Sequence, residues 1–220
     1  PAIEHPATLT LIPPELFIAR PALWLQTISR YRATISPAPN FAYGLCLDRV
    51  RDDQLDGVDL SCWRVALNGA EPVAPRVLRG FCERFSRWGF SPAAMTPVYG
   101  LSEAALAVTF SPLETPFDSR HFDRERLARE GRAVEATNGM ELVSLGRPLT
   151  DFALKVVDDD GRELGPDQVG RLLVSGPSLM EGYLEQPEAT AAVLRDGWLD
   201  TGDLGFVHDG LLFLTGRAKD

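Results

Sequence analysis

The chain has 220 residues, enough for one large domain or two small ones, and its 45% hydrophobic and 24% charged residues are typical of a globular protein. Its formal net charge of -9 and the lack of a basic run argue against a general nucleic-acid binder, so we expect no nucleic-acid partner. No apolar run approaches the roughly 20 residues of a membrane span. The 3 cysteines are widely spaced and form no metal-ligand pattern, which favours the reducing cytoplasm.

The N-terminal part of the chain is predicted to be mostly helical. Residues 14–32 carry apolar side chains at helical spacing, and Pro21 is expected to divide this segment or to start its second helix. A short strand is expected at 33–36. In the loop that follows, Asn40 is a possible cap for a short helix that opens at Phe41.

A strand, a helix and a second strand then alternate. The first strand covers 63–68 and ends in a loop at 69–72, the helix covers 74–87, and the second strand covers 94–98. Gly89 is expected to end the helix. Its apolar face holds Val77, Leu78, Phe81, Cys82 and Phe85. This alternation predicts a βαβ unit in a parallel sheet, with ligand contacts at the carboxyl ends of the strands.

The second strand runs into the segment 98–108, where four functional residues precede an apolar run. Tyr99 can stack on a flat ligand, and Gly100 permits close backbone approach. Ser102 can donate to an anionic oxygen, and Glu103 can hold a hard cation such as Mg²⁺. The alternative interpretation is a turn capped by Ser102 that starts a short helix.

The second half of the chain has a different character. Residues 111–140 are charged and rich in loops, with a short helix near 123–130 and no extended core pattern, so we expect a surface excursion there. Strands are then predicted at 152–157 and 170–176, a short helix at 188–194, and a hairpin around Asp209-Gly210. We therefore expect an α/β lobe (1–110), an insertion (111–142) and a small antiparallel β-barrel (143–220).

Several ordered motifs together resemble the adenylate-forming superfamily, which comprises acyl-CoA ligases, peptide-synthetase adenylation domains and luciferases. These motifs are Gly69-Ala70-Glu71-Pro72, Tyr99-Gly100-Leu101-Ser102-Glu103, Gly170-Arg171-Leu172-Leu173-Val174 with Gly182-Tyr183, Trp198 to Gly205, and Thr215 to Asp220. The chain is most similar in sequence to the fatty acyl-AMP ligases, both in the insertion and at residues 35–43, 65–72 and 101–109. In that branch the insertion hinders the thioester step with free coenzyme A. Many branch members carry alanine where this chain has Ser102.

The resemblance implies a role for each matching residue. Tyr99 would stack on adenine against the backbone of Gly69 and Ala70, and Ser102 would meet the α-phosphate. Glu103 would hold Mg²⁺ while pyrophosphate leaves. The full implied set comprises catalytic Ser102 and Glu103; nucleotide-binding Gly69, Ala70, Glu71, Tyr99, Gly100, Leu101, Ser102, Asp203 (on the ribose hydroxyls) and Arg217 (on ribose or phosphate); acyl-binding Asn40, Phe41 and Tyr43; and the interdomain hinge Asp220.

Simpler interpretations stand beside these roles. Asp203 can cap a turn, and Arg217 can be a solvated strand end. Gly182-Tyr183 is expected to be structural. Phe41 and Tyr43 can be core residues.

The implied activity uses ATP and Mg²⁺ to convert a fatty acid to acyl-adenylate and pyrophosphate. The acyl group would then pass to the phosphopantetheine of an acyl carrier protein in polyketide or lipopeptide assembly. Alternatives are an acyl-CoA ligase and a non-catalytic nucleotide-binding module. A hydrolase is disfavoured because the pattern begun by Gly100-Leu101-Ser102 needs a glycine where Ala104 stands.

The chain lacks a starting methionine and two features of the family, the phosphate-gripping loop and the C-terminal catalytic lysine. We therefore expect an excised piece of the large N-terminal domain that is inactive alone.

Overall fold

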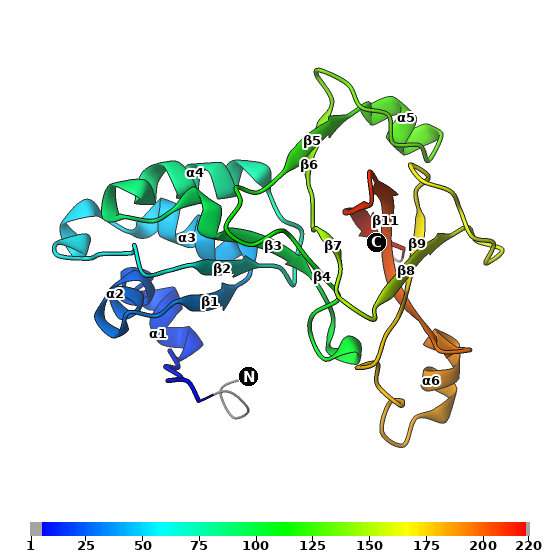
Figure 1. The fold of residues 1–220 in the computed structure, drawn as a ribbon, viewed down its shortest axis with the longest axis horizontal. Helices are drawn as coiled ribbons and strands as arrows, with labels where there is room; N and C mark the ends of the chain where they lie inside the picture. Colours follow the sequence, from blue (N-terminus) through cyan, green and yellow to red (C-terminus); the bar gives the residue numbers. More distant parts are fainter. Residues whose placement is uncertain (1–5, 219–220) are drawn as a thin grey trace.

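Two sheets meet in the middle of the computed structural model, which describes residues 6–218 (Figure 1). The first sheet has the order β1-β2-β3-β4-β7, and its first three strands are parallel. These strands are β1 (Ile35–Ala38), β2 (Val65–Asn68), β3 (Met95–Tyr99), β4 (Thr109–Phe110) and β7 (Arg147–Pro148). Helix α4 (Pro75–Phe85) connects β2 to β3, so the predicted βαβ unit is confirmed.

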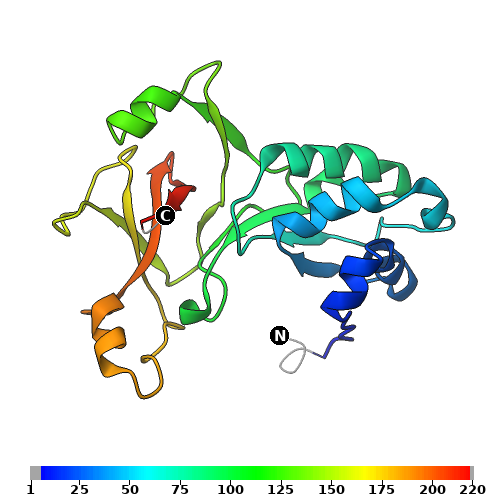
Figure 2. The same cartoon turned by 180° about the vertical axis from the view of Figure 1, so that it is seen from behind.

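Helices flank this sheet where the apolar spacing predicts them. They are α1 (Pro14–Ala19), α2 (Ala22–Tyr31), α3 (Asn40–Arg49) and α4, with short 3-10 turns at Asp52–Leu55, Ser86–Trp88, Pro92–Ala94 and Ser102–Ala104. Pro21 separates α1 from α2, and Gly89 closes the turn after α4 with a φ of 85°, as expected. Figure 2 shows α3 and α4 side by side along the sheet, with α1 and α2 on the β1 side of the lobe.

The start of α3 differs from the prediction. Asn40 is its first residue, and the N-cap position belongs to Pro39, which has no side-chain acceptor. The carboxylate of Glu71 accepts a hydrogen bond from the backbone N–H of Phe41 instead. A residue distant in sequence therefore caps this helix, which a local capping pattern cannot reveal.

An aromatic cluster forms the core of the first lobe. The rings of Trp24, Tyr43, Trp63, Phe81 and Phe90 lie at centroid distances of 5.0–6.3 Å. Tyr43 is completely buried, and its hydroxyl donates to the carbonyl of Leu67 at 2.9 Å. Tyr43 is thus a core residue, as the simpler interpretation held, and its assignment to an acyl channel is withdrawn. The spacing of apolar residues in α3 does not distinguish a residue that lines an acyl channel from a core residue.

The second sheet is antiparallel and curls into a half-barrel (Figure 1), in agreement with the antiparallel β-barrel subdomain expected for an incomplete fold. Its order is β10-β11-β9-β8, with β12 paired to β11. The strands are β8 (Ala153–Val157), β9 (Gly170–Ser175), β10 (Leu194–Arg195), β11 (Trp198–His208) and β12 (Leu211–Arg217). Helix α6 (Pro187–Val193) precedes β10, and the hairpin turn at Asp209-Gly210 is confirmed.

A second core joins the two sheets. Tyr99, Ala104 and Val108, from the end of β3 and its loop, are buried in one cluster with Leu145, Val156, Leu172, Val174, Leu199 and Leu212. Strand β7 also belongs to the first sheet, although the sequence places residues 147–148 with the barrel. The second sheet is therefore packed directly onto the carboxyl end of β3.

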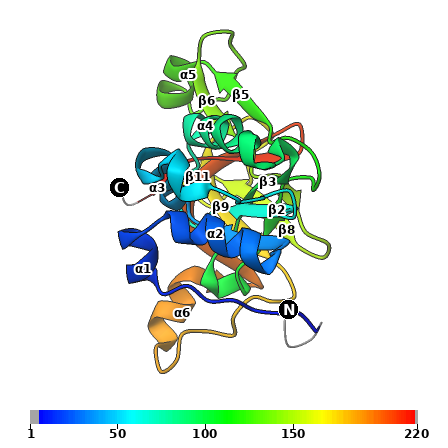
Figure 3. The same cartoon turned by 90° about the vertical axis from the view of Figure 1, so that its left-hand side faces the viewer.

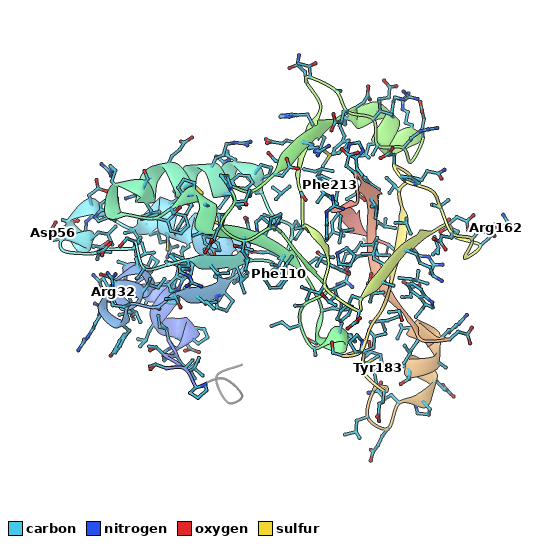
Figure 4. All side chains as sticks on the ribbon, in the orientation of Figure 1. Arg32, Asp56, Phe110, Arg162, Tyr183 and Phe213 are labelled. Atoms are coloured by element: carbon cyan, nitrogen blue, oxygen red, sulfur yellow. The ribbon has the colours of Figure 1, made fainter. Side chains whose placement is uncertain are left out.

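The insertion has a small core, contrary to the prediction. It contains β5 (Ser119–Phe122), the predicted short helix as α5 (Arg124–Arg129), and β6 (Met140–Val143). Its buried Phe122, Leu127 and Ala133 pack with Phe206 and Phe213 of the terminal hairpin. Figures 3 and 4 show this region at the end of the molecule opposite α6. The prediction failed because the apolar partners lie about 80 residues away in sequence.

A histidine also ties the insertion to the second sheet. His208 Nδ1 lies 2.6 Å from Asp167 Oδ1, and His208 Nε2 lies 3.1 Å from Glu135 Oε1 of the insertion. Burial alone would lower the pKa of His208, but the neighbouring carboxylates of Asp167, Glu135 and Asp209 outweigh it and raise the pKa.

We expect this contact to make stability depend on pH. The folded-state pKa of His208 is raised. Its contribution to the free energy of unfolding is therefore fully present below the ordinary pKa of about 6.5, and it is lost as the pH rises through the raised pKa. The Tm difference between the wild type and His208→Gln should shrink as the pH rises across this range. Thermal melts from pH 5.5 upwards measure this difference, and a difference independent of pH would contradict the assignment.

No helix among residues 6–218 has the length and apolar character that a bilayer crossing requires.

Candidate functional site

The carboxyl ends of β2 and β3 lie side by side. The pairing of Asn68 with Pro97 places Gly69 next to Val98. A Cβ on Gly69 would lie 2.7 Å from the carbonyl oxygen of Val98, so only glycine fits this close approach. Ala70 follows with a φ of 67°, which turns the backbone across the end of the sheet. Gly69 thus lies against the residue that precedes Tyr99, and the expected role of Gly69 and Ala70 in holding adenine stays a prediction.

The loop after β3 folds back tightly over Gly100. Backbone N–H groups of Leu106 and Val108 donate to the carbonyls of Leu101 and Tyr99. A Cβ on Gly100 would lie 1.4 Å from the carbonyl oxygen of Leu106. Ser102 begins the 3-10 turn and is exposed, whereas Leu101 occupies the N-cap position without a side-chain cap. The alternative interpretation, a helix capped by Ser102, is therefore wrong about the cap.

Tyr99 contacts Asp203 directly across the two sheets. The Tyr99 hydroxyl donates to Asp203 Oδ2 at 2.6 Å. The Tyr99 side chain is only 6% exposed, and burial, followed by the bond to the Asp203 carboxylate, raises the pKa of this phenol well above its ordinary value. The phenol therefore stays a proton donor near neutral pH. Segments that the sequence assigned to one adenosine site thus meet in the structure.

The terminal hairpin positions Asp203 and Arg217 opposite each other. They are paired residues of β11 and β12, and Arg217 Nε lies 3.3 Å from Asp203 Oδ1. Arg217 Nη2 also donates to the carbonyl of Thr201 at 3.3 Å. In the segment 200–203, the backbone N–H of Asp203 donates to Thr201 Oγ1, and the backbone N–H of Gly202 donates to Asp200 Oδ1. The Asp203 carboxylate instead lies toward Tyr99 and Arg217, so turn capping does not account for it.

The loop between β9 and α6 contacts Glu103. The Tyr183 hydroxyl donates to Glu103 Oε1 at 2.8 Å, and the bond to this carboxylate raises the pKa of the phenol. The sequence singled out Tyr183 only as a structural residue. Its place in a loop after the carboxyl end of a strand was the one signal that pointed to a site.

A second group of predicted residues lies on the α3 side of the 69–74 loop. Asn40 Oδ1 accepts from the backbone N–H of Ala74 at 3.2 Å and from Asn68 Nδ2 at 3.4 Å. Glu71 caps α3 through Phe41, whose ring is 51% exposed. Asn40, Phe41 and Glu71 are therefore brought together, and Asn40 fixes the loop that carries Gly69. The expected hinge, Asp220, lies outside the described residues.

The residues around Glu103 suit Mg²⁺ bound together with phosphates. Within residues 6–218 no three His, Cys, Asp or Glu side chains gather as a metal cage. Mg²⁺ bound with a nucleotide commonly uses one or two carboxylates and substrate phosphates, so Glu103 beside the exposed Ser102 fits that mode.

Known proteins resemble this chain over most of its length. A family model described as "AMP-binding enzyme" matches residues 1–184. A putative acyl-CoA synthetase from Caulobacter vibrioides is 43% identical over 218 residues, covering 97% of this chain and 38% of the relative. The medium-chain-fatty-acid–[acyl-carrier-protein] ligase JamA from Moorena producens is 39% identical over 229 residues, covering 94% of this chain and 37% of the relative.

Solved structures give the same result. The fatty acyl-adenylate ligase from L. pneumophila, in complex with acyl adenylate and pyrophosphate, superposes with a TM-score of 0.88 at 38% identity. That match covers 94% of this chain and 38% of the ligase. The chain thus spans well under half the length of these relatives.

Proposed function

This chain belongs to the family of AMP-binding enzymes, and from that premise we propose that the protein carrying it activates a fatty acid. ATP and the carboxylate would react to give acyl-adenylate and pyrophosphate. The observation that carries this proposal is the 2.6 Å hydrogen bond between Tyr99 and Asp203, residues 104 positions apart. It brings a flat aromatic group and a carboxylate with two acceptor oxygens to one place, as binding of an adenosine requires.

Each residue has a part in the proposed mechanism. Asp203 accepts the ribose hydroxyls, because a carboxylate has about four lone-pair sites and its contacts to Tyr99 and Arg217 use only some of them. Gly69 and Ala70 hold the adenine against the Tyr99 ring. The Ser102 hydroxyl donates to the α-phosphate, where negative charge develops as the fatty carboxylate attacks.

Glu103 is the proposed Mg²⁺ ligand. When bound there, Mg²⁺ supplies charge neutralisation for the departing pyrophosphate. The remaining catalysis is positioning, since Gly100 and the loop behind it hold Ser102 and Glu103 on the rigid end of β3.

The acyl group is proposed to lie along the α3 side of the site. Phe41 offers a half-exposed ring there, and Asn40 fixes the adjacent loop. Transfer to an acyl carrier protein is the favoured second step, supported by the similarity to JamA. Thioester formation with coenzyme A is the alternative, since another relative is described as a putative acyl-CoA synthetase.

The test measures pyrophosphate release by the whole protein that carries this sequence. Fatty acids of increasing chain length are supplied with Mg²⁺-ATP, followed by either a phosphopantetheinylated carrier protein or free coenzyme A. We expect fatty-acid-dependent pyrophosphate release and acyl transfer to the carrier protein. Nucleotide binding without any pyrophosphate release would favour a non-catalytic module, and acyl transfer to coenzyme A would favour the alternative ligase.

A further inference from the structure

The phenol of Tyr183 reaches Glu103 from a different part of the chain. Tyr183, labelled in Figure 4, lies in the loop between β9 and α6. Its hydroxyl donates to Glu103 Oε1 at 2.8 Å. The two residues are 80 positions apart. The bond occupies one carboxylate oxygen and leaves Oε2 for a cation, because each oxygen of a carboxylate accepts separately.

The loop that carries Tyr183 is bonded to the loop that carries Glu103. The backbone N–H of Met180 donates to the carbonyl of Glu103 at 2.7 Å. The Ser178 hydroxyl donates to the carbonyl of Ala104 at 2.9 Å. Together with the phenol, these contacts hold the backbone and the side chain of Glu103 separately.

The backbone of Tyr183 is bonded to helix α6. Its backbone N–H donates to Thr190 Oγ1 at 2.9 Å, and this hydroxyl donates in turn to the carbonyl of Gln186 at 2.9 Å. The preceding Gly182 has no room for a side chain, since a Cβ would lie 2.9 Å from Thr190 Cγ2. The backbone of Tyr183 is therefore fixed by α6, through Thr190.

We propose that Tyr183 is a positioning residue for Glu103, whose hydroxyl fixes the carboxylate in the orientation that binds Mg²⁺ with the nucleotide. Mg²⁺ demands near-ideal octahedral geometry, so a freely rotating carboxylate is a poorer ligand than a fixed one. Groups that orient a metal ligand typically change metal affinity 10–100-fold. This inference rests on the proposed function.

The test compares variants by a binding measurement that does not require turnover. Calorimetry follows the binding of an ATP analogue with a methylene between the α- and β-phosphorus atoms, at a series of Mg²⁺ concentrations, to the whole protein that carries this sequence. Tyr183→Phe should raise the Mg²⁺ concentration for half-maximal binding about tenfold. Tyr31→Phe, which alters a half-exposed ring on α2, should leave it unchanged.

A double-mutant cycle separates positioning from mere loop support. In a Glu103→Gln background, Tyr183→Phe should cause no further change in Mg²⁺ dependence, because the fixed carboxylate is already gone. Ser178→Ala loosens the same loop without removing the phenol, so it should lower Tm and change the Mg²⁺ dependence much less than Tyr183→Phe does.

The outcomes distinguish this inference from the proposed function. Equal effects of Tyr183→Phe in both backgrounds, or an effect of Ser178→Ala as large as that of Tyr183→Phe, would overturn the positioning role. If every variant still binds AMP without metal, the nucleotide site is supported although the positioning role is not. A wild type that binds neither AMP nor the analogue would overturn the proposed function and the inference together.

Discussion

Replacing Gly100 with alanine should destabilise the chain by at least about 3 kcal/mol, the upper range of overpacking substitutions. The new Cβ would lie 1.4 Å from the carbonyl oxygen of Leu106 and 2.5 Å from its carbonyl carbon. These are backbone atoms, so the clash is relieved only if the loop over Gly100 opens. The loop also carries Ala104 and Val108 into the second core, which should therefore loosen with it.

Gly44→Ala is the matched control for this substitution. Gly44 lies inside α3, and its added Cβ would make an ordinary contact with Val77 at 3.9 Å. Replacing a glycine inside a helix by alanine stabilises by roughly 0.5–1 kcal/mol, so the two variants should shift stability in opposite directions. Urea unfolding followed by circular dichroism measures both, and a Gly100→Ala midpoint at or above the wild-type value would contradict the geometry of the loop.

Asp203→Asn should weaken AMP binding by about 10–100-fold, which corresponds to the loss of charged hydrogen bonds. The substituted amide keeps one acceptor oxygen in place of two, so its NH2 group must face either Tyr99 or Arg217, which are both donors here. The ribose hydroxyls would lose the acceptor that we propose for them.

A ribose analogue makes this prediction specific. 2′-Deoxy-AMP should bind the wild type more weakly than AMP, whereas Asp203→Asn should bind both with similar affinity. Asp196→Asn is the control, because Asp196 is exposed in the turn before β11 with a φ of 50°, a conformation that asparagine also tolerates. Isothermal calorimetry provides these affinities, and an unchanged preference for AMP in Asp203→Asn would remove Asp203 from the ribose site.

Local patterns predicted the parts of the fold that local chemistry determines. The helix at 75–85, the close of the following turn at Gly89 and the parallel pairing of β2 with β3 follow from apolar spacing and turn residues. The hairpin at 209–210 follows from its Asp-Gly turn. The ordered motifs also placed Tyr99 near Asp203, and the hydrogen bond between them is observed, whereas their shared ligand stays a prediction.

Features that depend on distant partners were not predictable in this way. Phe122 is buried because Phe206 and Phe213 of the terminal hairpin pack against it, and no spacing within the insertion encodes that contact. The local sequence does not determine whether Tyr43 is exposed or buried, and its contacts with Trp24 and Trp63 decide this. A tertiary contact decides each case, and sequence periodicity reports only one element at a time.

A crystal structure of the whole protein bound to acyl-adenylate would show where the adenosine lies. We expect the adenine ring against Tyr99 and the ribose hydroxyls within hydrogen-bond distance of the Asp203 carboxylate. An adenosine bound away from both side chains would contradict this expectation.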